Sequence, residues 1–309
     1  TDRKEVVADR TDRVAERGDA GLLGLAFHPE DPDLAYTYQT YRGDAGLTNR
    51  VVCHRVGEEF ARESVVLDGI PAGRVHNGGP IAVGSDRALY VGTGDAGDPE
   101  RAGERDSLAG TVLRLTADGA AHPDNPFGGP VFTYGHRNPQ GFAWHGGALL
   151  GTDAGARAAT GASDAGETAS DATDRAASSA ADEVNHLHAG RDYGWPRARE
   201  STGNSAVDPL VAYDSTLGLG GAAVYRGPID DWRGDLFVAT LAGTHLRRIR
   251  VGDDGDVTQQ ERLLDGKYGR LRTVFTGPEG HLYVTTSNRD GRDDAAAPQD
   301  DRVLRIRPA

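Results

Sequence analysis

The sequence predicts an all-β protein, a six-bladed β-propeller with an incomplete N-terminal blade. Turns are plentiful, since 43 glycines and 15 prolines occur among 309 residues. Short strand-like runs recur five times in a fixed order, with no helical period between them. Self-similar antiparallel units of roughly 40 to 60 residues are typical of propeller blades. A β-sandwich is the alternative, but it does not explain the fixed order. We therefore expect residues 1–309 to form one propeller domain.

Each repeat begins with a glycine-rich opening that leads into a short strand, followed by two further β-rich runs. The openings are GLLGLAF from Gly21, HNGGPIAV from His76, GHRNPQGFAW from Gly135, GLGGAAVY from Gly218 and GRLRTVF from Gly269. The next runs are LAYTYQTYRG from Leu34, ALYVGTGDAG from Ala88, GALLGTDAG from Gly147, DLFVATLAG from Asp235 and HLYVTTSNRDG from His281. The third runs are RVVCHRV from Arg50, TVLRL from Thr111, DEVNHL from Asp182, HLRRIRV from His245 and RVLRIR from Arg302. The segment RKEVVAD from Arg3 is expected to close the incomplete blade.

Residues 153–181 interrupt the third repeat. They consist almost entirely of Ala, Ser, Thr, Asp, Gly and a few other polar residues. Such a composition lacks the large apolar side chains that offset the entropy of ordering. We expect an inserted, low-complexity acidic loop without chemistry of its own.

The overall charge is strongly acidic. Lys and Arg total 34 against 47 for Asp and Glu, a formal balance of −13. This sign argues against nucleic-acid binding and suits a salt-rich, halophilic environment. The single cysteine, Cys53, cannot form an internal disulfide. No apolar run approaches 18 residues, so we expect no transmembrane segment. No signal peptide precedes Thr1, and any export segment is expected to have been removed.

The strand openings are where function is expected. In a propeller the first strand of each blade lines the central channel, so the residues that open these strands meet at one mouth of the channel. The polar residues at these openings are Asp19, His76, His136, Arg137, Asn138, Thr216, Arg270 and Arg272. Three arginines, two histidines and an amide are therefore expected to converge.

Two of these openings point to specific chemistry. Arg270 and Arg272 are two apart, which on a strand places both guanidinium groups on one face, suited to a carboxylate or phosphate. The alternative is a solvated strand, as with Arg248 and Arg250. His76, followed by Asn and two Gly, is expected on a tight, exposed turn, where it is either a proton acceptor or plain polar surface.

Ten motifs carry a family resemblance. They are GLLGLAFHP, HNGG, YVGTGD, GTVLRL, DNPF, YGHRNPQGFAW, DEVN, DYGWP, GRLRTV and GPEGHLYV, in order from Gly21 towards the C-terminus. Together they resemble the soluble PQQ-dependent aldose (glucose/sorbosone) dehydrogenases. GHRNPQG with DYGWP is the specific part, whereas HNGG or GPEG alone would be weak.

The resemblance implies an enzyme, a six-bladed propeller that binds pyrroloquinoline quinone (PQQ) with calcium and oxidises an aldose sugar to its lactone, hydride passing to PQQ. His76 would be the general base and Arg137 would polarise a quinone carbonyl. The residues implied to contact the cofactor are Asn138, Thr216, Arg270, Arg272 and Asp19. Main-chain carbonyls of Gly155 and Ala156 would bind calcium. The resemblance also implies an external electron acceptor and an extracellular or cell-surface location.

Three positions depart from the family pattern. Ala242 stands where a cofactor-binding Lys is usual, Asp19 where Gln is usual, and Val75 where an acid precedes the base. These departures favour an alternative, a catalytically degenerate propeller that binds a sugar, anion or partner. A further alternative is a calcium-dependent lactonase-like hydrolase, with Asn138, Asp95 and Asp153 around the ion.

The remaining conspicuous residues have structural interpretations. Trp144, Trp195 and Trp232 follow turn-rich strands and are expected to be packing anchors rather than sugar platforms. The DGR tripeptide at residues 290–292 is expected to be a surface turn.

Overall fold

Short antiparallel strands dominate the secondary structure. The computed structural model describes residues 6–58, 60, 63–155, 182–196, 206–252, 255–289, 297 and 299–308. The chain divides into two compact units. Unit 1 comprises residues 1–139 with 189–206, and unit 2 comprises residues 140–188 with 207–309. No helix in the described ranges is long and apolar enough to cross a membrane.

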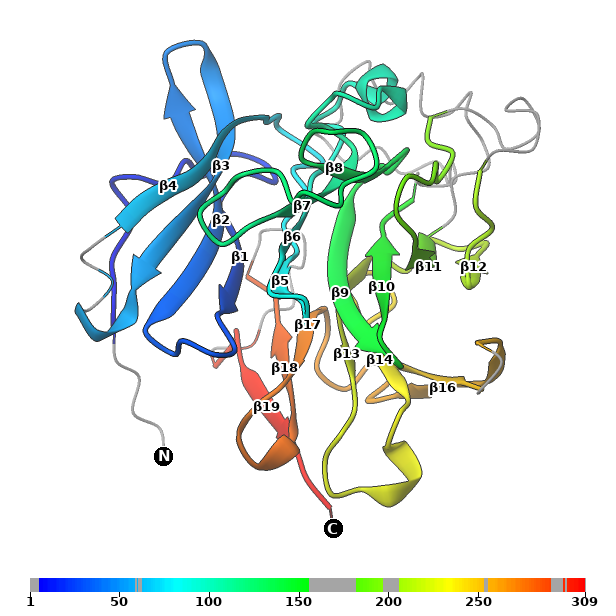
Figure 1. Ribbon diagram of the computed structural model, residues 1–309. Helices are drawn as coiled ribbons and strands as arrows, with labels where there is room; N and C mark the ends of the chain where they lie inside the picture. Colours follow the sequence, from blue (N-terminus) through cyan, green and yellow to red (C-terminus); the bar gives the residue numbers. More distant parts are fainter. Residues whose placement is uncertain are drawn as a thin grey trace, which may run out of the picture. The chain divides into compact units, whose positions relative to one another are not determined.

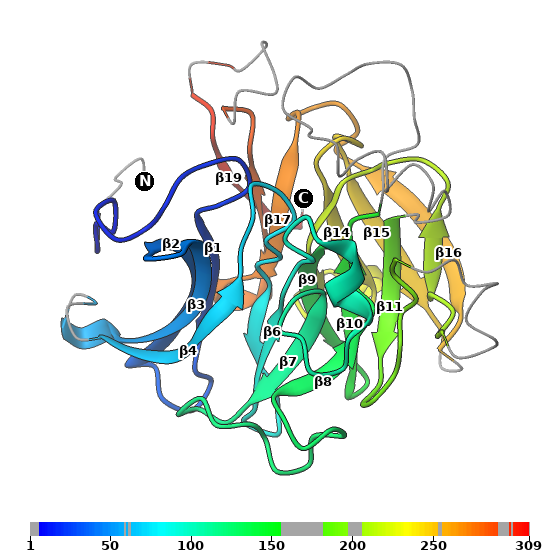
Figure 2. The same cartoon turned by 90° about the horizontal axis from the view of Figure 1, so that it is seen from above.

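Unit 1 contains two sheets in which consecutive strands pair antiparallel (Figure 1). The first has the order β1 (Leu22–Phe27), β2 (Leu34–Gly43), β3 (Gly46–Arg55) and β4 (Glu63–Pro71), and Figure 2 shows these strands side by side. The second has the order β5 (Ile81–Val83), β6 (Leu89–Gly92), β7 (Thr111–Leu115) and β8 (Val131–Tyr134). The short 3-10 helices of this unit are η1 (Val56–Glu58) and η2 (Pro99–Gly103).

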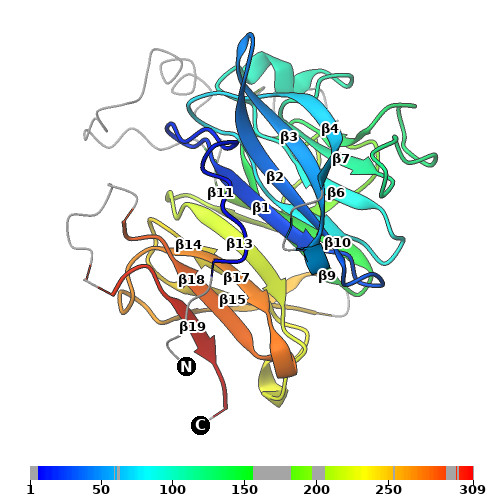
Figure 3. The same cartoon turned by 90° about the vertical axis from the view of Figure 1, so that its left-hand side faces the viewer.

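Unit 2 repeats the same meander. One sheet contains β9 (Pro139–His145), β10 (Ala148–Asp153), β11 (Asp182–Leu187) and β12 (Val211–Tyr213). The next contains β13 (Leu219–Val224), β14 (Leu236–Thr240), β15 (Leu246–Val251) and β16 (Val257–Leu263). The last contains β17 (Leu271–Thr276), β18 (Leu282–Thr286) and β19 (Val303–Ile306), which lie side by side in Figure 3. Its 3-10 helices include η4 (Asp230–Trp232) and η5 (Pro278–Gly280).

The predicted strands and their order are confirmed. Every predicted run of the five repeats contains a strand, and three runs coincide with strands residue for residue, LAYTYQTYRG with β2, TVLRL with β7 and DEVNHL with β11. Among the described residues the strands form five sheets, the last with three strands. A sixth blade is not confirmed, and residues 6–9, the described part of RKEVVAD, contain no strand.

The predicted acidic loop lies mostly outside the described residues. Asp153, its first residue, belongs to β10, pairs with Glu183 of β11 and is buried. Ala154 and Gly155 follow the strand, while residues 156–181, and with them Ala156, are not among the described ones. The DGR tripeptide at 290–292 is outside them as well.

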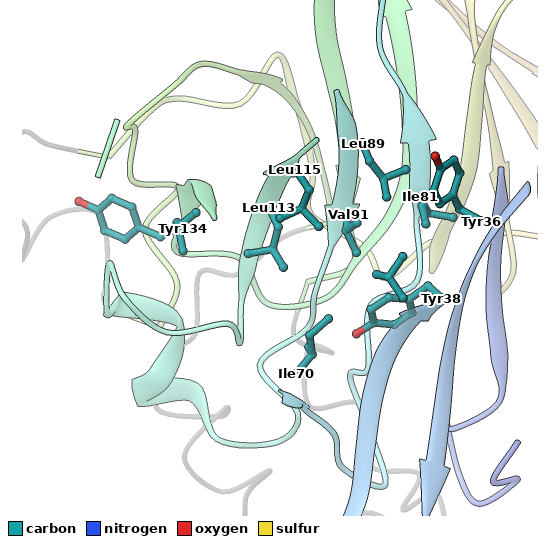
Figure 4. Close-up of a cluster of buried hydrophobic side chains, with 11 residues drawn as sticks. Tyr36, Tyr38, Ile70, Ile81, Leu89, Val91, Leu113, Leu115 and Tyr134 are labelled. Carbon is teal, nitrogen blue, oxygen red and sulfur yellow. The ribbon is translucent and has the colours of Figure 1, made fainter. Parts of the chain in front are cut away.

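Apolar side chains from both sheets of unit 1 form one core (Figure 4). The buried members are Tyr36, Tyr38, Val51, Ile70, Ile81, Leu89, Val91, Leu113, Leu115, Val131 and Tyr134. Fully burying a side chain of this size contributes about 1.5–3 kcal/mol. Tyr38 also contacts the loop that precedes β5, because its hydroxyl donates to the main-chain oxygen of Asn77 at 2.9 Å. Burial raises the pKa of Tyr38, so this hydroxyl stays a donor.

Unit 2 contains two further cores. One lies around Leu150, Val184, Leu236, Val238 and Ile249 of the sheets β9–β12 and β13–β16. The other joins β13–β16 to β17–β19 around Tyr225, Phe237, Leu246, Leu271 and Val284. Each strand that opens a sheet in unit 2 is thus held on a packed layer.

Buried histidines should make stability depend on pH. Burial is the largest cause that lowers the pKa of His54, His186 and His245 below the ordinary 6.5. The unfolded chain therefore binds protons at a higher pH than the folded chain, so the contribution is present above about 6.5 and lost as pH falls. We expect the free energy of unfolding, measured by urea denaturation, to decrease from pH 7 to pH 5.

His245 provides the specific test of this pH dependence. It is fully buried, and its Nδ1 lies 2.6 Å from the carbonyl oxygen of Gly243. The His245→Gln variant should show a shallower decline between pH 7 and pH 5. The control is His122→Gln, at a half-buried position where the ring lies 3.9 Å from Asp124. An equal slope in the wild type and His245→Gln would contradict the prediction.

Candidate active site

The loop that carries His76 joins β4 to β5. Gly78 in this loop has a φ of +72°, and a Cβ there would lie 2.4 Å from the carbonyl oxygen of Gly92. Glycine is required because both the left-handed backbone and the close approach exclude a side chain. His76 itself has a φ of +54°, which non-glycine residues adopt rarely. The tight turn is confirmed, but the predicted exposure is wrong, since the His76 side chain is only 12% exposed.

Asn77 anchors this loop to the first sheet. It is buried, and its Oδ1 accepts hydrogen bonds from the main-chain N–H of Gly73 at 2.9 Å and from Asn49 Nδ2 at 3.2 Å. Its Nδ2 donates to the Gly73 oxygen at 2.8 Å. These bonds satisfy both ends of the buried side-chain amide, and Tyr38 satisfies the main-chain oxygen of the same residue. The backbone that presents His76 is therefore held firmly.

His76 forms a dyad with Asp95, which follows β6. The His76 Nδ1 lies 2.9 Å from Asp95 Oδ1, and the Asp95 side chain is fully buried. A carboxylate only accepts, so Nδ1 carries the proton and Nε2 has the lone pair. Among the described residues no hydrogen-bond partner is seen for Nε2. This arrangement is that of a general base oriented by an acid.

Trp195 and Arg137 complete the group around Asp95. The indole Nε1–H of Trp195 donates to Asp95 Oδ2 at 2.9 Å, and the Arg137 guanidinium lies 5.5 Å from the centre of the indole ring. The main-chain oxygen of Arg137 accepts from the Asp95 N–H at 2.9 Å. The interpretation of Trp195 as a packing anchor is therefore incomplete, because its polar edge belongs to the site.

Two further predicted residues contact the His76 loop. Asp19 Oδ2 accepts a hydrogen bond from the main-chain N–H of His76 at 3.2 Å. Asn138 Oδ1 accepts from the N–H of Gly78 at 3.0 Å. Both side chains thus support the turn, and unit 1 brings together Asp19, His76, Arg137 and Asn138.

His136 differs from its predicted role as a polar residue at the opening. Its side chain is buried, its Nε2 is 2.9 Å from Thr133 Oγ1, and its ring stacks on Tyr193 at 4.6 Å between centroids. These contacts make His136 a packing residue of the opening rather than a second proton acceptor.

Arg270 and Arg272 open the last sheet of unit 2. Arg270 precedes β17, and the register shifts between Leu271 and Thr273, so strict strand alternation does not relate the two arginines. The main-chain N–H of Arg270 donates to Asn288 Oδ1 at 2.8 Å, and its Nε donates to the Ser287 oxygen at 3.2 Å.

Arg272 has a different partner. Its Nη1 donates to Gln140 Oε1 at 2.6 Å. Gln140 belongs to the GHRNPQG motif, so two predicted openings meet at this contact within unit 2. Whether Arg270 and Arg272 share one face stays a prediction.

Asp182 organises the segment next to Thr216. Its oxygens accept from the N–H groups of Gly155 at 2.8 Å, Leu217 at 2.6 Å and Gly218 at 2.7 Å. Burial raises the pKa of Asp182, while these three hydrogen bonds act in the opposite direction. The half-buried Thr216 is thereby held just before β13.

The predicted metal residues are only partly described. Gly155 is buried and its amide points to Asp182, whereas Ala156 lies outside the described residues. Within the described ranges, no group of three or more His, Cys, Asp or Glu could hold a metal ion. A cation near Gly155 would therefore depend on carbonyl oxygens.

Asp95, Trp195 and Gln140 were not predicted as site residues. Asp95 was considered only as a metal ligand, yet its oxygens are hydrogen-bonded to His76, Gly97 and Trp195. Each missed residue lies inside a motif already singled out, YVGTGD, DYGWP or GHRNPQG. The motifs predicted the loops that form the site, but they did not predict which side chains lie next to His76.

The antiparallel sheets place the protein in the class of all-β propellers, and its structural neighbours in that class are PQQ dehydrogenases. The profile of the glucose/sorbosone dehydrogenase family matches residues 1–295. The chain therefore belongs to that family.

Solved structures and a curated relative agree with this assignment. The chain is 35% identical to the PQQ-bound aldose sugar dehydrogenase of Streptomyces coelicolor, with a TM-score of 0.77 over 94% of this chain and 81% of that one. An oxidoreductase of Thermus thermophilus described as a glucose dehydrogenase is 41% identical, with a TM-score of 0.80 over 95% and 85%. Quinoprotein glucose dehydrogenase B of Acinetobacter calcoaceticus is 28% identical over 72% of this chain and 52% of its own length.

Gly78 and Gly128 allow backbone strain and steric clash to be separated. Their φ angles are +72° and +73°, but a Cβ on Gly128 would meet nothing within 4 Å. Gly128→Ala should cost about 1–2 kcal/mol, the ordinary penalty of a left-handed alanine. Gly78→Ala should cost more, because the backbone must move as well. Equal losses in urea denaturation would contradict this account of the HNGG turn.

Proposed function

We propose that the protein is a quinoprotein aldose dehydrogenase that oxidises an aldose at its anomeric carbon. The observation that carries the proposal is the His76–Asp95 dyad. It leaves Nε2 of a largely buried imidazole as the proton acceptor. Family membership and the PQQ-bound Streptomyces coelicolor relative support the redox assignment.

The donor set of the described residues fits a flat, anionic quinone cofactor. Arg137, Arg270 and Arg272 provide guanidinium groups, whose fork geometry matches carboxylates. Asn138 and Thr216 add an amide and a hydroxyl. Arg137 and Asn138 of unit 1 are proposed to contact PQQ, and the same role is proposed for Thr216, Arg270 and Arg272 of unit 2 on the family resemblance alone. When bound, PQQ supplies the two-electron acceptor that takes hydride from the anomeric carbon, with the lactone as product.

The chain's own part in the reaction is proton transfer and orientation. His76 Nε2 is proposed to take the proton of the anomeric hydroxyl as the carbonyl bond forms. Asp95 holds the imidazole in the required tautomer and stabilises the positive charge that develops on it. Arg137, whose guanidinium lies over the Trp195 ring, would supply positive charge to a bound quinone.

Calcium, proposed at the carbonyl oxygens of Gly155 and Ala156, is the less supported part of the assignment. Main-chain oxygen ligands suit a hard cation. Asp182 is proposed to hold Gly155 in place rather than to ligate, because its oxygens already accept three main-chain N–H groups. Isothermal calorimetry with calcium, in the presence and absence of PQQ, measures this binding directly.

The contacts of Asp95 argue against the lactonase-like alternative. A catalytic calcium would need its carboxylate, which is committed to His76, Gly97 and Trp195. The degenerate-propeller alternative rests on Ala242, Val75 and Asp19. Retention of the complete dyad favours the enzyme, and Asp19 is used to support the His76 backbone.

The remaining parts of the proposal follow from the family alone. We propose that electrons leave to an external acceptor, that the protein works outside the cytoplasm, and that the blades number six. A sixth blade would add one more sheet to the five formed by the described residues.

Replacing His76 tests the proposed function. In a dye-reduction assay with PQQ, calcium and several aldoses, His76→Gln should lower kcat by about 10²–10⁴, the usual value of a general base. Absorbance titration should show PQQ binding largely retained. His188→Gln, at an exposed position, is the control. Absence of quinone-dependent turnover in a folded, PQQ-loaded wild type would refute the proposal.

A further inference from the structure

The Asp95 carboxylate is fully buried and accepts hydrogen bonds on both oxygens. Oδ1 accepts from His76 Nδ1 at 2.9 Å and from the Gly97 N–H at 2.8 Å, while Oδ2 accepts from Trp195 Nε1 at 2.9 Å. Burying a carboxylate is costly unless such donors replace water. The proton-binding strength of the dyad therefore depends on what occupies Oδ2 as well as Oδ1.

Trp195 is the residue that occupies Oδ2. An indole has a single N–H donor, and here both the indole and the carboxylate that accepts its hydrogen bond are buried. The face of the same ring lies under the Arg137 guanidinium. One side chain thus contacts the acid of the dyad at its edge and the arginine of the site at its face.

We propose that Trp195 is a positioning residue for the reaction, tuning the His76–Asp95 dyad through Oδ2 and supporting Arg137 through its ring. The inference rests on the proposed function, because it takes His76 as the general base. It assigns to the DYGWP motif a role in proton transfer rather than in packing alone.

The direction of the effect follows from the indole dipole. The N–H hydrogen is the positive end of the group and lies beside the carboxylate, so it weakens the attraction between Asp95 and a protonated His76. Removing it should strengthen proton binding at the imidazole. Removing the carboxylate charge should do the opposite. In the described part of the chain, the other ionisable side chains seen at the dyad and at Trp195 are Asp19, at the His76 main-chain N–H, and Arg137, at the indole ring, and both stay in place.

Trp232 is a matched control for a tryptophan that only packs. It contacts Tyr225 and Phe237, and Arg248 lies 5.7 Å from its ring. Within the described part of the chain, no hydrogen bond from its indole nitrogen is seen. Trp232→Phe therefore changes an aromatic ring beside an arginine without touching a dyad.

The first test is the pH profile of kcat/KM in the PQQ-dependent dye assay. Trp195→Phe should move the midpoint of the acidic limb upward by roughly half to one pH unit, the equivalent of one hydrogen bond. Asp95→Asn should move it downward, and Trp232→Phe should leave it unchanged. Unchanged midpoints in Trp195→Phe, or shifts of Trp195→Phe and Asp95→Asn in the same direction, would overturn the proposal.

The second test needs neither cofactor nor turnover. In the ¹⁵N-labelled protein without PQQ, the three tryptophans yield three indole N–H signals, assigned by the Trp→Phe variants. The Trp195 signal should shift with the same pH midpoint as the His76 ring signals, and this dependence should vanish in His76→Gln. A pH-independent Trp195 signal would refute the coupling. If coupling is present but the wild type has no quinone-dependent activity, the proposed function fails while Trp195 remains linked to the dyad.

Discussion

A carboxylate that is buried needs hydrogen-bond donors in place of water, and the candidate active site is arranged around one such carboxylate, that of Asp95. Transferring an isolated ion into a medium of low dielectric constant would cost tens of kcal/mol, so the surrounding N–H groups are a condition of folding. His76, Gly97 and Trp195 supply them from three separate loops. The same bonds that make burial tolerable also select the histidine tautomer that can accept a proton.

The openings of the sheets make this arrangement possible. A glycine at Gly78 lets the backbone pass close to Gly92, and Asn77 ties the turn to the first sheet through buried hydrogen bonds. The loops at the ends of these strands thus hold their polar side chains in restricted positions. General-base catalysis needs groups held in this way. Similar anchoring occurs in unit 2, where Asp182 binds three main-chain N–H groups beside Thr216.

Local sequence patterns predicted the strands well. For the site, they predicted which loops are involved but not which side chains contact one another. Alternation and glycine spacing are properties of neighbouring residues, so β2 and β11 could be located to the residue. The dyad could not, because Asp95 is 19 residues from His76 and 100 residues from Trp195. Arg272 shows the same limit, since the register shift in β17 depends on pairing with β18 rather than on the arginine spacing.

By itself, the sequence determined the all-β class, the order of strands within each repeat, the family and the loops that carry the candidate site residues. Only the tertiary structure decided that His136 packs, that Asp95 orients His76 and that Trp195 donates to Asp95. The physical reason is that strand formation depends on side chains a few residues apart. The state of a buried ionisable group depends instead on every dipole brought around it, from whatever distance along the chain.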